Sequence, residues 1–476
     1  MRERIKTFLL ISLVGISLLF TKRLWMELPN QMFSVFNRNE EVYGSSYLLS
    51  DMIIPNKYLL NFNEKKHTLF YDDSKHGLWT NSRMILNSIL GSKDIMIVDL
   101  PNEEFLTYNG KRSISFYFPE KINTYILAKA LDVRNPNSIV DTITNVNSIY
   151  IYLGKEDAFF AFSDGEKHIA VYDKSIDVTS LSEQVTAIEE TQNYNYYRSI
   201  RESLKIDNDI YISHEMKNIL PEVFVENEIR NLDEEEKKEL AERFFNKDID
   251  YIREIVENNG STMYIYNTRV LKLNINGTLE YFHPLEQDVT KRNLYQSLST
   301  AAEFISKNSG VPKGMYLAKV QETKSDNSLG YNLTFRYRVR GIPVILGNDM
   351  VDFVQIEVFN NHVRSYKHFI RKDMNKPVDN IPSGEKMLSS FDVIDMNYDF
   401  LVQEYLKENN ISLENTEEPA IEDVLSSAFI RDITLSYFDP CLKDIEDKLI
   451  GVWVIRTNKG LYAFDVYNGS LVYEKN

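Results

Sequence analysis

Cysteine, glycine and the motifs that depend on them are scarce in this sequence. Its 476 residues include one cysteine, Cys441, so the chain can form no intramolecular disulfide and no zinc or iron–sulfur site built from cysteines. The same scarcity excludes the lipid-modified cysteine of a lipoprotein. Only 18 glycines are present, and neither a G-x-x-x-x-G-K-S/T nor a G-x-G-x-x-G motif occurs. The common phosphate-binding loops of nucleotide-binding proteins are therefore excluded.

Residue patterns that mark catalytic or metal sites are also absent. The seven histidines form no H-E-x-x-H motif, and no two are three or four residues apart, so no helix face presents two of them to a metal. His362 and His368 stand at even spacing on one expected strand and are interpreted as packing or surface residues. Cys441 has the acidic neighbours Asp444 and Glu446 rather than the cations that activate a thiol. We therefore assign no catalytic, cofactor-binding or metal-binding residue and predict that the protein is not an enzyme.

The charge of the chain is negative and unevenly distributed. Lysine and arginine number 54 against 70 aspartates and glutamates, a formal net charge of −16. Such a balance argues against nucleic acid as a partner, because phosphate binding depends on a basic surface. Residues 1–23 hold five basic residues and one acidic residue, so they carry +4 and the remainder carries −20.

One apolar segment lies near the N-terminus. Residues 7–21 carry no charge, and a helix that continues through residues 24–26, with Lys22 and Arg23 reaching back to the headgroups, is about 20 residues or roughly 30 Å long. We predict one transmembrane helix over residues 7–26, with Trp25 at the membrane interface. A cleaved signal peptide is the alternative, but the small-x-small site that cleavage requires does not follow the apolar run.

The predicted helix also offers a contact surface. Ser12 and Gly15 lie on one face with Leu19 below them, and small residues allow two membrane helices to approach closely. These three residues are the candidates for contact with another membrane helix. Basic residues before the helix favour a single-pass protein in the cell membrane, with a cytoplasmic N-terminus and the bulk of the chain extracytoplasmic.

The rest of the chain predicts an α+β protein of three extracytoplasmic domains, because runs of short strands alternate with occasional helices. After the tip and anchor of residues 1–26, residues 27–215 form a short stalk and a first α+β domain. Residues 216–375 and 376–476 form the middle and C-terminal domains, each a helix packed on an antiparallel meander sheet. The helices are expected at 294–307 and 398–408, and Asp233 is expected to cap a connecting helix together with Glu236.

Three segments carry a resemblance to a known family. They are Ile54-Pro55 near the start of the external part, the Gly-Ser-Thr-x-Tyr segment at 260–264, and the ending IGVWVIRTNKGLYAFDVYNGSLVY at 450–473. With the single basic-flanked helix before them, the chain resembles the YycH family. These are regulatory proteins of low-GC Gram-positive bacteria, encoded with the WalK/WalR (YycG/YycF) two-component system of the cell wall.

The resemblance implies a function as well as a fold. It implies that the last two modules share a topology with each other and with the protein YycI, and that no catalytic residue exists. The implied partners are a WalK/YycG-like sensor histidine kinase and a YycI-like protein, bound through membrane helices and external domains. Two rival functions remain, a cell-wall polymer or peptide-binding module independent of a kinase, and an unrecognised hydrolase.

Overall fold

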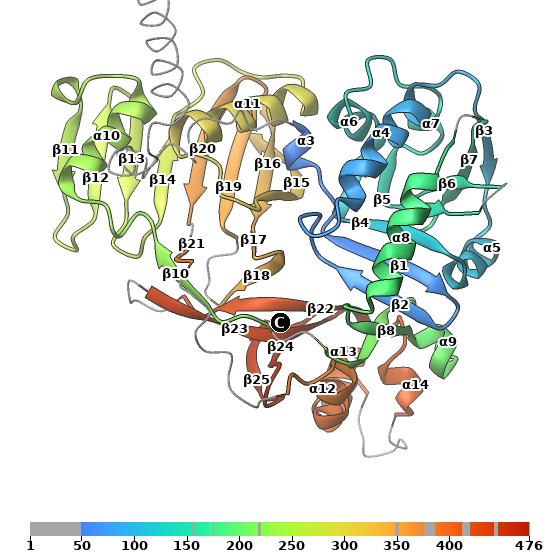
Figure 1. Ribbon diagram of the computed structural model, residues 1–476. Coiled ribbons are helices and arrows are strands. Elements are labelled where there is room, and N and C mark those ends of the chain that lie inside the picture. The colour runs from blue at the N-terminus through green and yellow to red at the C-terminus, as the bar shows by residue number, and fades with distance from the viewer. Residues whose placement is uncertain are drawn as a thin grey trace, which may run out of the picture.

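Three β-sheets with their helices form the molecule (Figure 1). The structure is a computed structural model, and it describes residues 49–475 except 155–156, 175, 218–219, 348–351, 370, 376–385, 412–418 and 442–445. Sheet I contains strands from residues 57–215, sheet II contains strands from residues 253–368, and sheet III joins the C-terminal strands to shorter strands from earlier segments. Sheet III lies across the bottom of the view, with sheet II and sheet I above it. In the part of the chain that is described, no helix is both long and apolar enough to cross a membrane.

Sheet I has the strand order β3-β7-β6-β5-β4-β1-β2-β8-β9, and all of its pairings are antiparallel. Its strands are β1 (Lys57–Asn63), β2 (Lys66–Phe70), β3 (Met96–Asp99), β4 (Ser113–Asn123), β5 (Asn145–Tyr152), β6 (Phe159–Ser163), β7 (His168–Tyr172), β8 (Tyr196–Ser199) and β9 (Tyr211–Glu215). The helices are α3 (Leu49–Met52), α4 (Leu78–Gly91), α5 (Asn102–Thr107), η1 (Tyr108–Gly110), α6 (Thr124–Ala130), α7 (Ile139–Thr142), α8 (Thr179–Thr191) and α9 (Ile200–Leu204). Alternate residues of β5 to β7 face the main core, and the others form a second cluster beneath α5 and η1.

Sheet II has the order β11-β12-β13-β14-β20-β19-β16-β15 and is antiparallel throughout. Its strands are β11 (Arg253–Val256), β12 (Thr262–Tyr266), β13 (Arg269–Leu273), β14 (Leu279–Phe282), β15 (Tyr316–Ser325), β16 (Ser328–Arg336), β19 (Val354–Phe359) and β20 (His362–His368). Helices α10 (Glu234–Phe245) and α11 (Leu294–Asn308) cover one face, and η2 (Ile249–Tyr251) follows α10. Asp233 and Glu236 form the predicted capping box at the start of α10.

Sheet III combines the end of the chain with strands that come from earlier segments. Its order is β17-β18-β22-β23-β10-β21, and β24 and β25 continue from the second half of β23. The strands are β10 (Val223–Asn227), β17 (Arg338–Val339), β18 (Ile342–Leu346), β21 (Arg371–Asp373), β22 (Ile430–Asp439), β23 (Glu446–Thr457), β24 (Leu461–Asp465) and β25 (Leu471–Lys475). Helices α12 (Ser390–Met396), α13 (Tyr398–Asn409) and α14 (Ile421–Val424) lie at the bottom of the view, and α12 also packs against β9 of sheet I (Figure 1). Phe400 of α13 packs edge-on against Tyr462, with ring centroids 5.3 Å apart.

The predicted α+β class, with helices on sheets, is confirmed. The C-terminal meander β22-β23-β24-β25 is antiparallel as predicted, but sheet III as a whole is mixed because β18 pairs with β22 in parallel. Four strands between residues 216 and 375, namely β10, β17, β18 and β21, belong to sheet III. The chain therefore crosses between sheets II and III several times, and the proposed boundaries at 215/216 and 375/376 stay predictions.

Candidate functional site

The residues predicted to contact a partner in the membrane are Ser12, Gly15, Leu19 and Trp25. All four lie outside the described residues, and their roles stay predictions. Within the described residues, charged side chains from separate parts of the chain come together at another candidate site. They lie where the three sheets meet, and we call this place the three-sheet junction.

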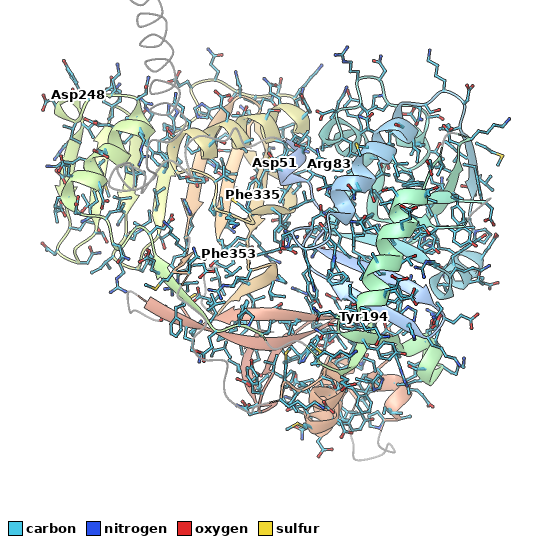
Figure 2. All side chains as sticks on the ribbon, in the orientation of Figure 1. Asp51, Arg83, Tyr194, Asp248, Phe335 and Phe353 are labelled. Atoms are coloured by element: carbon cyan, nitrogen blue, oxygen red, sulfur yellow. The ribbon has the colours of Figure 1, made fainter. Side chains whose placement is uncertain are left out.

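The three-sheet junction is defined by ten residues. Sheet I contributes Lys57, Tyr117 and Glu120, and sheet II with the loops at its end contributes Tyr316, Lys319, Arg336 and Asp352. Sheet III contributes Arg338, Asp432 and Arg456. Figure 2 labels Phe353, the neighbour of Asp352, at the end of sheet II that faces sheet III.

Asp432 links sheet III to sheet I through this junction. Its Oδ1 accepts a hydrogen bond from Lys57 Nζ at 2.8 Å, and its Oδ2 accepts one from Thr434 Oγ1 at 2.6 Å. Burial opposes ionisation of this carboxyl, but Lys57, Thr434 and Arg456 together outweigh it and hold the pKa of Asp432 below its ordinary value. Lys57 Nζ also lies 5.0 Å from the centre of the Tyr117 ring, a favourable cation–π distance.

Arg456 is one of the junction cations for which the described residues show no ion pair. It lies directly across from Asp432 in the antiparallel pair β22–β23, where an arginine and an aspartate normally pair. The Asp432 carboxylate is instead bonded to Lys57 and Thr434. The side chain of Arg456 keeps contact with solvent, yet the surrounding protein and then the charge of Arg336 lower its pKa.

Two further arginines belong to the junction. The Nε of Arg336 donates to Asp352 Oδ1 at 2.5 Å, and the side chain of Asp352 is only 6% exposed. Arg338 is buried over the face of Tyr316, 4.0 Å from the ring centre, and donates to the carbonyl of Pro55 at 2.8 Å. Its Nε has no hydrogen-bond partner among the described residues. The junction therefore holds more positive charge than its own carboxylates balance.

Buried polar contacts tie sheet I to sheet III beside the junction. Asn208, after α9, donates from Nδ2 to the carbonyls of Leu425 at 2.9 Å and Ile430 at 3.0 Å. Ser213 and Ser390 exchange hydrogen bonds between β9 and the start of α12. The three sheets are thus connected by directional contacts that hold their relative orientation.

Replacement of Asn208 by alanine is expected to lower the free energy of unfolding by about 2 kcal/mol, because two buried carbonyls would lose their donor. Urea unfolding of the full chain measures this loss. Asn145→Ala is the matched control, since the Asn145 side chain is exposed and bonds only to Thr144. Equal stability of the two variants would contradict a role for Asn208 in joining the sheets.

Cys441 and the histidines of β20 lie in buried or half-buried positions. Cys441 is half-buried, and burial, followed by the charge of Asp439, raises the pKa of its thiol to about 12. It is therefore a neutral thiol at pH 7. His368 is buried in β20, whereas His362 is half-buried against His283, with ring centres 4.4 Å apart.

Sequence reasoning missed the three-sheet junction. Asp352 lies just before β19, and the other nine members come from β1, β4, β15, β16, β17, β22 and β23. The members are up to 399 residues apart in the sequence, between Lys57 and Arg456. A charged residue on a strand is typical of a solvent-facing position, so none of these residues indicates by itself that it meets the others. The sequence contains one local indication of a basic site, the pair Arg336 and Arg338, because residues two positions apart on an extended segment share a side.

Comparison with known proteins identifies the fold. No protein-family model matches the sequence, and neither does any curated protein. The crystal structure of YycH from Bacillus subtilis matches with a TM-score of 0.56 at 12% identity, over 89% of this chain and 98% of that chain. An uncharacterized protein from Eubacterium rectale matches at a TM-score of 0.35, with 11% identity over 59% of this chain and 88% of that one. The C-terminal domain of YpeB from Bacillus megaterium matches at 0.25, with 12% identity over 51% and 97%. The chain has a YycH-like fold, as its resemblance in sequence predicted.

Proposed function

We propose that the chain is a membrane-anchored, non-enzymatic regulator that binds a WalK-like sensor histidine kinase of the cell envelope, together with a YycI-like protein. The observation that carries the proposal is the YycH-like fold, which extends over 89% of the chain. In this proposal the helix of residues 7–26 holds the protein in the cell membrane, its N-terminus is cytoplasmic, and residues 27–476 lie outside.

A regulator without chemistry of its own acts by binding one conformational state of the kinase more tightly than another. The connections between the three sheets suit such a role. The Lys57–Asp432 pair and the hydrogen bonds of Asn208 hold sheets I and III in a fixed relative orientation. A partner that binds one of these sheets would therefore bind a rigid unit and not a flexibly linked domain. The bound state of the kinase would then be stabilised across the whole contact.

The segments that carry the family resemblance are structural. Gly260 has a φ of +87° in the turn that opens β12, a conformation that glycine adopts without strain, and residues 450–473 form most of the meander β23-β24-β25. They belong to the strands and turns of the shared fold. We place partner recognition first in the membrane helix, with Ser12, Gly15 and Leu19.

The test uses the full chain in its own membrane. Ser12→Leu with Gly15→Leu is expected to reduce crosslinked co-purification of the sensor kinase several-fold, because larger side chains hold two helices apart. Ser17→Leu is the matched control, since at 100° per residue position 17 falls on the opposite side of a helix from position 15. Transcription that depends on the kinase is measured in the same strains.

Three outcomes decide the proposal. Loss of kinase capture and a changed transcript level in the double variant alone support it. If an unrelated span in place of residues 7–26 leaves both readouts unchanged, the helix has no part in the mechanism. If no histidine kinase is captured by the full chain and purified wall polymer is bound instead, the protein is a wall-binding module and the proposal is wrong.

A further inference from the structure

Helix α8 forms one wall of a surface groove on sheet I (Figure 1). The buried side of this helix consists of Leu181, Val185 and Ile188. Another side holds four exposed residues that follow one another at helical spacing, Thr179, Glu183, Thr186 and Glu190. These four residues border a hollow of about 510 Å³, which we call the α8 groove.

The floor of the α8 groove is apolar. Leu153, directly after β5, and Val178, directly before α8, are buried and line the hollow. Ala158 and Ile176 also line it, and both are half-buried and pack against the main core of the molecule. A hollow of this size that combines apolar walls with a few polar side chains is the usual form of a binding site.

The charged side chains that line the α8 groove are all acidic. They are Asp177, Glu183 and Glu190, and the lining contains no lysine or arginine among the described residues. Asp177 accepts a hydrogen bond from the backbone N–H of Thr179 at 2.9 Å. Glu183 and Glu190 form no hydrogen bond or ion pair within the part of the chain that the structure describes. The groove therefore presents three carboxylates above an apolar floor.

The nearest cation does not balance this charge. Arg112 reaches the edge of the groove and donates to Thr186 Oγ1 at 2.9 Å, but it is paired with Glu189, with Nη1 and Oε2 2.7 Å apart. Glu189 and Glu190 both stand in the last turn of α8, which contains no basic residue. A carboxylate is unfavourable at this end of a helix, because the helix dipole places partial negative charge there. A cation bound beside Glu190 would relieve this arrangement.

The α8 groove continues past Glu190 into a second hollow of about 530 Å³, because Glu190 lines both. Its other lining residues include two tyrosines and charges of both signs, Tyr194, Tyr196, Glu189, Glu215, Lys66 and Lys217. Figure 2 labels Tyr194, just beyond the end of α8. Since lysines accompany the carboxylates there, the unbalanced negative charge belongs to the first hollow.

We propose that the α8 groove binds a short basic segment of a partner protein, whose apolar side chains cover the floor and whose lysine or arginine side chains pair with Glu183 and Glu190. The wall from Thr179 to Glu190 is about 17 Å long at ~1.5 Å per residue, which matches about five residues of an extended chain. Complementary charge selects basic over acidic segments and speeds their association. This surface goes beyond the proposed function, because it is external and serves whichever protein supplies the segment.

The experiment measures fluorescence anisotropy of a labelled hexapeptide of alternating lysine and leucine, added to the purified full chain in a non-ionic detergent, with detergent alone as the baseline. The wild type is expected to bind this peptide and not the peptide in which glutamate replaces lysine. Glu183→Gln with Glu190→Gln is expected to weaken binding about tenfold, as the loss of two partly shielded ion pairs allows. Ala187→Trp, at an exposed position of the groove wall, is expected to abolish binding by filling the hollow without a change of charge.

The matched control is Glu235→Gln with Glu239→Gln. Both glutamates are exposed on α10, so their replacement removes the same charge from a helix that does not border the groove. Unchanged affinity in this control supports the proposal. An equal loss in both double variants would mean a diffuse charge effect and would overturn it, and so would undiminished binding by Ala187→Trp.

Spermine tests whether the ligand is a peptide or a small organic cation. This polyamine has positive charge but no apolar side chains, so it is expected to displace the peptide only at a much higher concentration. Displacement at a concentration equal to that of the peptide would show that the apolar floor contributes nothing, and the peptide assignment would be wrong. Thermal unfolding midpoints equal to that of the wild type show that loss of binding in a variant is not loss of fold. Kinase capture through the membrane helix is a separate measurement, so either proposal can fail while the other stands.

Discussion

Replacement of Arg371 by methionine is expected to lower the free energy of unfolding by about 3–5 kcal/mol, the usual cost of removing one partner from a buried ion pair. The side chain of Arg371, on β21, is 1% exposed, and its two carboxylate partners, Asp439 and Asp447, are 0% and 1% exposed. One Nη of Arg371 donates to Asp439 Oδ1 at 3.2 Å and to Asp447 Oδ2. Its Nε lies 3.1 Å from Asp439 Oδ2, within ion-pair distance although the N–H is not directed at that oxygen.

The expected loss is large because both carboxylates would remain in the core without a cation. Burial raises the pKa of Asp439, and Arg371 is the main group that opposes this rise. Without Arg371, Asp439 and Asp447 must either take up protons or expose themselves to water. Sheet III would lose cohesion where β21 joins β10 and β10 joins β23.

Urea unfolding followed by circular dichroism and tryptophan fluorescence measures the loss. The triple variant Arg371→Met, Asp439→Asn, Asp447→Asn removes all three charges and is expected to recover a substantial part of the stability, because no unpaired charge stays buried. Arg201→Met is the control at the surface, where Arg201 pairs with the exposed Asp207 and Asp209 and contributes at most about 1 kcal/mol. A loss in Arg371→Met no greater than in Arg201→Met would refute the argument.

The same cluster shows why part of the fold could not be read from the sequence. Arg371-Lys372-Asp373 is a charged triplet, which is typical of a loop or a solvent-facing strand end. It forms a strand because Asp439 and Asp447, 68 and 76 residues further along, neutralise Arg371 in the core. No local pattern reveals a pairing over that distance.

Elements with local signals were predictable. The capping box of Asp233 and Glu236 begins α10 as expected, and the Asn276-Gly277 dipeptide forms the turn before β14, with Gly277 at a φ of +83°. Asn123, which directly precedes α6, caps that helix, with its side chain accepting from the backbone N–H of Ile126. These features depend on residues within four positions of each other, so the sequence contains all the information that they need.

Strand partners and the charged junction were not predictable, because both depend on which sheet a strand joins. Strand β18 is a short apolar run, yet the chain between β16 and β19 leaves sheet II there so that β18 pairs in parallel with β22. In the same excursion β17 places Arg338 over the ring of Tyr316. A single sequence does not identify such long-range neighbours, whereas strand pairing and side-chain contacts in the structure do.

Acidification is expected to destabilise the chain through His368, a buried residue of β20. Its Nδ1 hydrogen-bonds to Tyr366 Oη at 3.0 Å, and its Nε2 is buried without a partner among the described residues. Burial lowers the pKa of His368 to about 3 from an ordinary value of 6.5, and no charged neighbour offsets the effect. The folded state therefore keeps this imidazole neutral over a pH range in which the unfolded chain protonates it.

The direction of the pH effect follows from this difference. Above pH 6.5 neither state binds the proton, so His368 contributes no pH dependence. Between pH 6.5 and about 3 the unfolded state binds one proton more, and stability falls by about 1.4 kcal/mol for each pH unit. The expected loss from this one residue is about 2 kcal/mol at pH 5.

The measurement compares the wild type with His368→Gln by urea unfolding from pH 7.5 to 5, because contributions from all other ionisable groups cancel in the difference. His368→Gln loses some packing at every pH, but its deficit relative to the wild type is expected to shrink by about 2 kcal/mol between pH 7 and pH 5. Tyr366→Phe is the matched control, since it removes the hydroxyl bonded to His368 and leaves the imidazole in the core. Its pH profile should keep the slope of the wild type. A wild-type profile parallel to that of His368→Gln would show that His368 binds its proton equally well in the folded and unfolded states, which contradicts a pKa lowered by burial.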